Sequence, residues 1–299
     1  MLRTARLPAV LLLFSLNAAA QEEAVELKLH WEPGQTYVQE SDTDTVNFLT
    51  AIGKTSDQKL RLHQTTRITV SKNASDQTEA QVLVESLLGE MTYEGQTHAY
   101  DSKNPASSHP LLQRSFGGAA GRSFTLVYDV KDQFIDAKDA ASGVDPDLVE
   151  IANARQLADL YRRSLEMGLP SIPVHPGDKW ISEQIVVFPQ AGSVEVKLNS
   201  KFDGVVEREG RRQAQIAFEG LMKTQRDKDG NGRELPTERP VSLGDDSKVN
   251  GHIFFDLERR TISLAVFSAT LQLKIEGKPL PVRQQVTTRL VSMRPTAAP

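Results

Sequence analysis

The sequence predicts a mainly β protein, in which long curved antiparallel sheets form a half-barrel or open barrel. We expect the sheets to come from two related halves packed around one central helix. Three observations predict this fold class: strand-like alternation over long segments, a weak internal repeat, and one amphipathic helical segment between the repeats. An antiparallel sheet with one buried and one solvated face requires such alternation.

The alternation is clearest within residues 58–91 and again within residues 194–223. In the first segment, one face of the expected strands is apolar and consists of Leu60, Leu62, Ile68 and Val70. The other face is polar and consists of Lys59, Arg61, His63 and Arg67. In the second segment the apolar positions are Ala214, Ile216, Phe218 and Met222. Several of these strands exceed ten residues, which is long for a globular sheet and indicates strong curvature.

The internal repeat consists of three elements in the same order. "WEPGQTY" at 31–37 matches "VHPGDKW" at 174–180, and each is followed by one of the two long strand pairs. Farther along, "VYDVKDQFIDA" resembles "FFDLERRTISLA", so that Asp129 matches Asp256. Three elements in order favour a duplication, although Pro-Gly is a common turn signal and coincidence stays open.

Residues 144–168 form the one convincing helix, and they lie between the halves. The segment opens with a staple residue, an N-cap and a first-turn proline, namely Val144, Asp145 and Pro146. A stripe at helical spacing follows, namely Ile151, Ala154, Ala158, Tyr161 and Leu165. Gly168 and Pro170 end the helix. The stripe predicts packing on the concave side of the sheet, either as a core plug or as a lid over a ligand.

Residues 101–123, which are rich in Ser, Pro and Gly, predict a long loop that is either functional or disordered.

The first twenty residues predict a signal peptide. Arg3 and Arg6 precede the apolar run Leu7–Leu16, and small residues lead to a cleavage site between Ala20 and Gln21. The run of about ten residues is too short to span a membrane of about 30 Å, and no other segment approaches that length. We therefore expect a periplasmic or secreted protein without a transmembrane segment.

The predicted organisation follows from these boundaries. It comprises a signal peptide at 1–20, a first β half at 21–143, the helix at 144–168, a second β half at 169–294 and a disordered tail at 295–299.

The composition narrows the possible functions. The chain has no cysteine, which excludes disulfides, thiol catalysis and lipid modification of cysteine. Without Arg3 and Arg6, 33 basic residues face 39 acidic ones, a net charge near −6. No basic stripe with interleaved aromatic residues is present, so we expect no nucleic-acid partner.

The "WEPGQTY" start, the long strands and the signal peptide resemble an uncharacterised family of exported bacterial β-rich proteins. At the level of the fold, the pattern is similar to the lipoprotein-carrier proteins of the periplasm, which use several helices where this chain has one. That resemblance implies a curved half-barrel that holds acyl chains. It offers no motif from which a binding residue can be transferred.

The stretch "DKDGNGRELPTE" at 227–238 has the spacing of a calcium loop. Its oxygen ligands would be Asp227, Asp229, Asn231 and Glu238. Pro236, however, lies where a helix should follow, and Asp-Gly-Asn-Gly is a favourable hairpin turn. We favour the hairpin, keep calcium as the alternative, and expect no other cofactor.

The sequence contains no nucleophile elbow, no zinc-protease motif and no phosphate loop. The leading hypothesis is therefore a non-enzymatic exported protein that binds a hydrophobic or amphipathic ligand, such as a lipid, on a curved sheet. A structural or protein-interaction module of the cell envelope is the alternative, and a hydrolase is a distant third.

Overall fold

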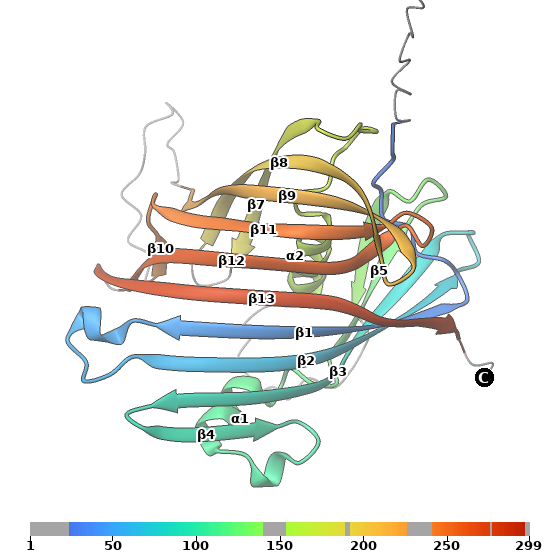
Figure 1. The fold of residues 1–299 in the computed structure, drawn as a ribbon. Coiled ribbons are helices and arrows are strands. Elements are labelled where there is room, and N and C mark those ends of the chain that lie inside the picture. Colours follow the sequence, from blue (N-terminus) through green and yellow to red (C-terminus); the bar gives the residue numbers. More distant parts are fainter. Residues whose placement is uncertain (1–23, 140–153, 189–191, 226–240, 276, 297–299) are drawn as a thin grey trace, which may run out of the picture.

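The prediction of a mainly β fold is confirmed. The computed structural model describes residues 24–139, 154–188, 192–225, 241–275 and 277–296. The described residues form one 13-stranded antiparallel sheet and two α-helices (Figure 1). The sheet is open, since its two end strands, β6 and β7, do not pair with each other in the described part of the chain.

The first half contains six strands and two short helical turns. The strands are β1 (Gln35–Asn47), β2 (Gln58–Lys72), β3 (Thr78–Tyr93), β4 (Gln96–Asp101), β5 (Ser123–Tyr128) and β6 (Phe134–Asp139). The turns are η1 (Leu49–Ile52) and η2 (Pro105–Ser107), and α1 (Pro110–Phe116) follows η2.

The second half follows α2 (Ala154–Glu166). Its strands are β7 (Lys179–Phe188), β8 (Gly192–Arg208), β9 (Arg211–Thr224), β10 (Val241–Leu243), β11 (Ser247–Asp256), β12 (Thr261–Ile275) and β13 (Lys278–Pro295).

The strand order is β6-β5-β3-β2-β1-β13-β12-β11-β9-β8-β7, with β4 paired to β3 and β10 to β12. Each half is therefore a meander, β1-β2-β3-β5-β6 in one and β7-β8-β9-β11-β12 in the other. Both meanders cross the sheet in the same direction, from β1 to β6 and from β7 to β12, as two copies of one unit would. β13 joins them by pairing with both β1 and β12.

The two Pro-Gly turns occupy matching places ahead of β1 and β7. Gly34 (φ +81°) donates its N–H to the carbonyl of Val70 in β2, at 2.8 Å. Gly177 (φ +92°) donates to the carbonyl of Phe202 in β8, at 2.7 Å. Both glycines hold a left-handed backbone conformation that residues with a Cβ rarely adopt.

Asp129 and Asp256, the other matched pair, have corresponding positions and similar hydrogen bonding in their turns. Each begins the turn between the last two matched strands of its half, and its carboxylate accepts two backbone N–H bonds from that turn. Such turns are typical of aspartate.

The core lies on one face of the sheet, which we term the inner face. It forms one apolar cluster in the second half, a second in the first half and a third around β3, β4 and α1. The sheet curves so that α2 lies behind its central strands in Figure 1, and α2 contacts β5, β6 and β7. The helix thus occupies the opening between the two ends of the sheet, which we term the seam.

The predicted helix stripe accounts for this position. Ala158 and Leu165 are buried in the first-half cluster and Tyr161 packs against it, whereas Leu160 packs against the second-half cluster. Gly168, with φ +79°, ends the helix where the sequence places its end. Residue 151 and the predicted helix start at 144–146 lie outside the described residues, as does the signal peptide.

Two local features differ from the expectation. Residues 101–123 contain η2 and the helix α1, in which Leu112 is buried and the His109 side chain accepts the Leu111 N–H as a cap. The final strand runs to Pro295, and Thr296 donates its backbone N–H to the Gly34 carbonyl at 2.7 Å. The first residues of the expected tail are therefore held in place.

Candidate functional site

Two cavities open on the outer face of the sheet, opposite the core. The first, of about 600 Å³, is lined by polar outward residues that include Asp42, Asp44, Arg61, His63, Glu90 and Asp101. The second, of about 860 Å³, is lined by Trp180, Ile181 and Phe218 together with polar residues such as Lys179, Glu219 and His252. Both cavities lie on the outer face, and neither is lined by a residue of the helix α2.

A third cavity, of about 600 Å³, lies at the seam. Its walls come from residues 26–29, the β5–β6 turn, the last turn of α2, residues 169–173 and β7. Its volume falls within the range of about 300–1,000 Å³ that is usual for small-molecule sites. We term it the seam cavity, and it is the candidate functional site.

One wall of the seam cavity is apolar. It includes Leu27, which is buried, together with Leu29, Phe134 and Leu169. The N-terminal segment is held there by a pair of backbone hydrogen bonds between Val25 and Val174, of 2.8 and 3.0 Å. This wall is suited to a hydrocarbon chain, because apolar surface buried from water gains about 25 cal/mol per Å².

The polar part of the lining, which we term the polar wall, includes Arg162, whose side chain is only 15% exposed. Its Nη1 donates to Glu166 at 2.6 Å and its Nη2 to Asp159 at 2.8 Å. Spacings of three and four residues place these groups together on one helix face. The guanidinium also lies over the ring of Phe134, 4.5 Å from its centre.

Two buried atoms of the polar wall lack hydrogen-bond partners. They are the Nε of Arg162, a donor, and the Oε1 of Gln184, an acceptor on β7. A buried polar atom without a partner costs about 1–3 kcal/mol, so that each such atom in a native protein calls for an explanation.

Burial is the largest cause of the pKa shifts of Glu166, Tyr128 and Tyr161. It raises the pKa of the Glu166 carboxyl above its usual value, although the Arg162 guanidinium works in the opposite direction. Burial also raises the pKa values of the phenols of Tyr128 and Tyr161. The two tyrosines therefore remain neutral at physiological pH and act as hydrogen-bonding, largely apolar groups.

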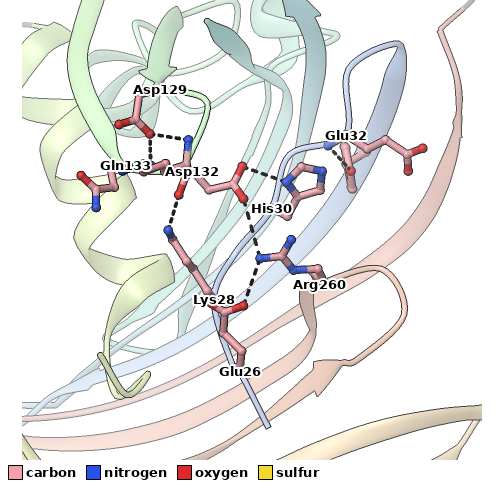
Figure 2. Close-up of polar contacts among 10 residues, drawn as sticks. Glu26, Lys28, His30, Glu32, Asp129, Asp132, Gln133 and Arg260 are labelled. Atoms are coloured by element: carbon pink, nitrogen blue, oxygen red, sulfur yellow. Dashed lines mark hydrogen bonds and ion pairs between the residues drawn. The ribbon is translucent and has the colours of Figure 1, made fainter. Parts of the chain in front are cut away.

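A polar network fixes the N-terminal segment beside the cavity (Figure 2). The Asp132 carboxylate accepts a hydrogen bond from His30 Nδ1 at 2.8 Å and lies 3.7 Å from Arg260 Nη2. Lys28 Nζ donates to the Lys131 carbonyl, and the His30 N–H donates to the Arg260 carbonyl at 2.9 Å. Asp132 thus ties the β5–β6 turn to both the N-terminal segment and the β11–β12 turn.

The predicted calcium ligands cannot be placed against this site, because Asp227, Asp229, Asn231 and Glu238 lie outside the described residues. Within the described part of the chain, no group of three or more His, Asp or Glu side chains is arranged to hold a metal ion. No helix there is long and apolar enough to cross a membrane.

The residues of the polar wall were not predicted. Arg162 and Glu166 carry a weak signal, since opposite charges four residues apart indicate an exposed helix face. Gln184 carries none, because a single glutamine in an alternating strand is indistinguishable from any solvated position.

No family model and no curated protein matches the chain. Among solved structures, the fold is similar to lipovitellin, studied for its lipid–protein interactions, with a TM-score of 0.48 and 11% identity. That match covers 90% of this chain and 26% of the lipovitellin chain, so the protein spans about a quarter of its length.

Two bacterial proteins match over nearly their whole lengths. A candidate exported protein with a YmcC-like fold from Bacteroides fragilis has a TM-score of 0.29 and 10% identity, covering 91% of this chain and 99% of its own. A candidate lipoprotein from Parabacteroides distasonis has a TM-score of 0.31 and 10% identity, covering 91% and 100%. Identities and scores this low transfer neither a ligand nor an activity.

Proposed function

We propose that this protein is an exported, non-enzymatic protein that binds a hydrophobic or amphipathic ligand in the seam cavity. The observation that carries the proposal is the composition of that cavity. Its lining places apolar side chains, among them Leu27 and Leu169, beside charged groups that include Arg162, which is ion-paired to Glu166. An amphipathic ligand has an apolar part and a polar part that such a lining would suit.

Native mass spectrometry tests the proposal. The mature protein is purified from the periplasm without detergent, and we expect an adduct in the lipid mass range that is lost on denaturation. Ser171→Phe places a ring at an exposed position of the seam cavity and should reduce the adduct. Ser107→Phe is the matched control, since it makes the same change at the first outer-face cavity.

Bare protein in every preparation would contradict the proposal. An adduct that Ser171→Phe leaves intact would place the ligand elsewhere on the sheet and would equally overturn the assignment to the seam cavity.

A protein-interaction role is the second candidate, and one observation favours it. β7 ends the sheet and pairs only with β8 among the described strands, while Ile181 and Ile185 on its outer face are 61% and 45% exposed. A free strand edge can accept a strand from a partner. In that case Ile181→Lys would abolish partner binding and leave the adduct unchanged.

A further inference from the structure

Two segments that line the seam cavity each present an apolar side chain to solvent. Residues 169–173 all line the cavity, and among them Ile172 is 70% exposed. The β5–β6 turn contributes Asp132 and Gln133 to the lining, and Val130 in the same turn is 73% exposed. A single exposed hydrophobic residue needs no explanation, but these are the two most exposed large ones in the described part of the chain. Both belong to segments that border one cavity.

The β5–β6 turn holds Val130 at its corner. Asp132 donates its backbone N–H to the Asp129 carbonyl at 3.1 Å, which closes a turn with Val130 as the first of its two central residues. The Asp129 carboxylate also accepts the N–H groups of Lys131 and Gln133, each at 2.8 Å. Because the backbone on both sides is fixed in this way, Val130 stays exposed instead of folding back onto the core.

The segment 169–173 can approach an apolar medium at little cost to its backbone. Pro170 and Pro173 have no backbone N–H, and Leu169 donates its own to a carbonyl of α2 at 3.1 Å. Backbone donors that lose water without gaining a partner oppose entry into lipid. Few such donors therefore accompany Ile172 if its side chain leaves water.

We propose that Ile172 and Val130 dock the mouth of the seam cavity on the surface of a lipid bilayer. This inference rests on the proposed function, because a bilayer is where a hydrophobic or amphipathic ligand for the cavity resides. The two side chains would enter the interfacial layer of the bilayer. The ligand would then pass between bilayer and cavity without exposing its apolar part to water.

The charges of the cavity have both signs. Among the described residues, the lining holds two basic side chains and three acidic ones, namely Lys28, Arg162, Glu26, Asp132 and Glu166. An excess of basic residues, which would attract anionic lipids, is therefore not found there. We expect apolar contact to drive docking, so that binding depends little on salt or on the fraction of anionic lipid.

Sedimentation of sucrose-loaded vesicles with the mature protein tests the proposal. The vesicles consist of phosphatidylcholine, with or without phosphatidylglycerol, and we expect similar binding to both. Two aliphatic side chains should bind more weakly than one myristoyl chain, whose association constant is about 10⁴ M⁻¹, so the titration extends to millimolar lipid.

Ile172→Asp and Val130→Asp should each weaken vesicle binding about tenfold, because each variant replaces an apolar contact by a charge. Ile181→Asp and Val291→Asp are the matched controls and should change nothing. Ile181 and Val291 are 61% and 51% exposed, and neither lines the seam cavity. All four positions are exposed, so that each variant should fold.

The outcomes separate this inference from the proposed function. Absence of vesicle binding by the wild-type protein, binding only with phosphatidylglycerol, or equal effects in all four variants would overturn the docking surface. A lipid adduct in native mass spectra of the same protein would then leave the proposed function standing. Selective weakening in Ile172→Asp and Val130→Asp would support the docking surface, and if no preparation carried an adduct, the proposed function alone would fall.

Discussion

Replacement of Asp132 by glycine should destabilise the mature protein by about 2–3.5 kcal/mol. The carboxylate is 17% exposed and accepts a 2.8 Å hydrogen bond from His30. A hydrogen bond to a charged group stabilises by about 1.5–3 kcal/mol, and the more exposed pair with Arg260 adds about 0.5 kcal/mol. Asp132 has φ +58°, a conformation that glycine adopts without strain. Glycine also raises the entropy of the unfolded chain, so the side chain's contribution is the difference from a control at a matched backbone conformation.

Urea unfolding, followed by tryptophan fluorescence, measures this loss. The control is Asp76→Gly, because Asp76 has φ +59° in the β2–β3 turn but a carboxylate that is 69% exposed and that pairs, among the described residues, with Lys72. An exposed pair of this kind is worth less than about 1 kcal/mol. Equal losses in the two variants would refute the view that Asp132 ties the N-terminal segment to the turns.

Three further predictions concern single groups elsewhere in the chain. A hydrogen bond from a lysine, helped by one from an asparagine, lowers the pKa of Glu79, so its contribution to stability is present near pH 7 and lost as the pH falls below about 4.5. Glu79→Gln should therefore destabilise in urea unfolding at pH 7 but not at pH 3, and equal effects at both would contradict this. Gly251→Ala should destabilise the protein by about 1–3 kcal/mol, because the added Cβ would overlap the Val266 carbonyl oxygen and lie 2.7 Å from the Phe218 ring. An unchanged midpoint of urea unfolding would show that the strand shifts to accommodate the methyl group. If residues 227–238 are a hairpin, native mass spectra without chelator should lack a calcium adduct, and an adduct that disappears in Asp227→Ala would establish the calcium loop.

The fold class could be predicted because period-two alternation over long segments reports a local property of each strand. The position of α2 followed similarly from the buried stripe that includes Ala158 and Leu165. The helix α1 was missed because seven residues give barely two turns of periodicity. Its start carried a signal nonetheless, since Pro110 stands at the first helical position after the capping His109.

The candidate site could not be predicted, for a physical reason. Arg162 lies on a helix and Gln184 on an end strand, and both line the seam cavity only because the sheet curves until β7 reaches α2. The long strands indicate that the sheet is curved, but local sequence patterns do not give the degree of curvature that brings these elements together. The cavity is lined by five separate segments of the chain, which no single local pattern covers.

The duplication stays a prediction, although the strand order and the matched turns agree with it. Gly34 and Gly177 begin corresponding meanders, and Asp129 and Asp256 close corresponding turns. Stable folding of either half alone, expressed as a separate chain, would test whether each was once independent.

The pairing of β1 with β13 has a consequence for how the chain folds. The centre of the sheet is built from the first and last described strands, so that Thr36 and Thr296, 260 positions apart, share a 3.0 Å hydrogen bond. Pairings between such distant residues form slowly. Until β13 arrives, β1 and β12 each present a bare strand edge, and bare edges invite aggregation. The chain is therefore most prone to aggregation just before its last described strand pairs.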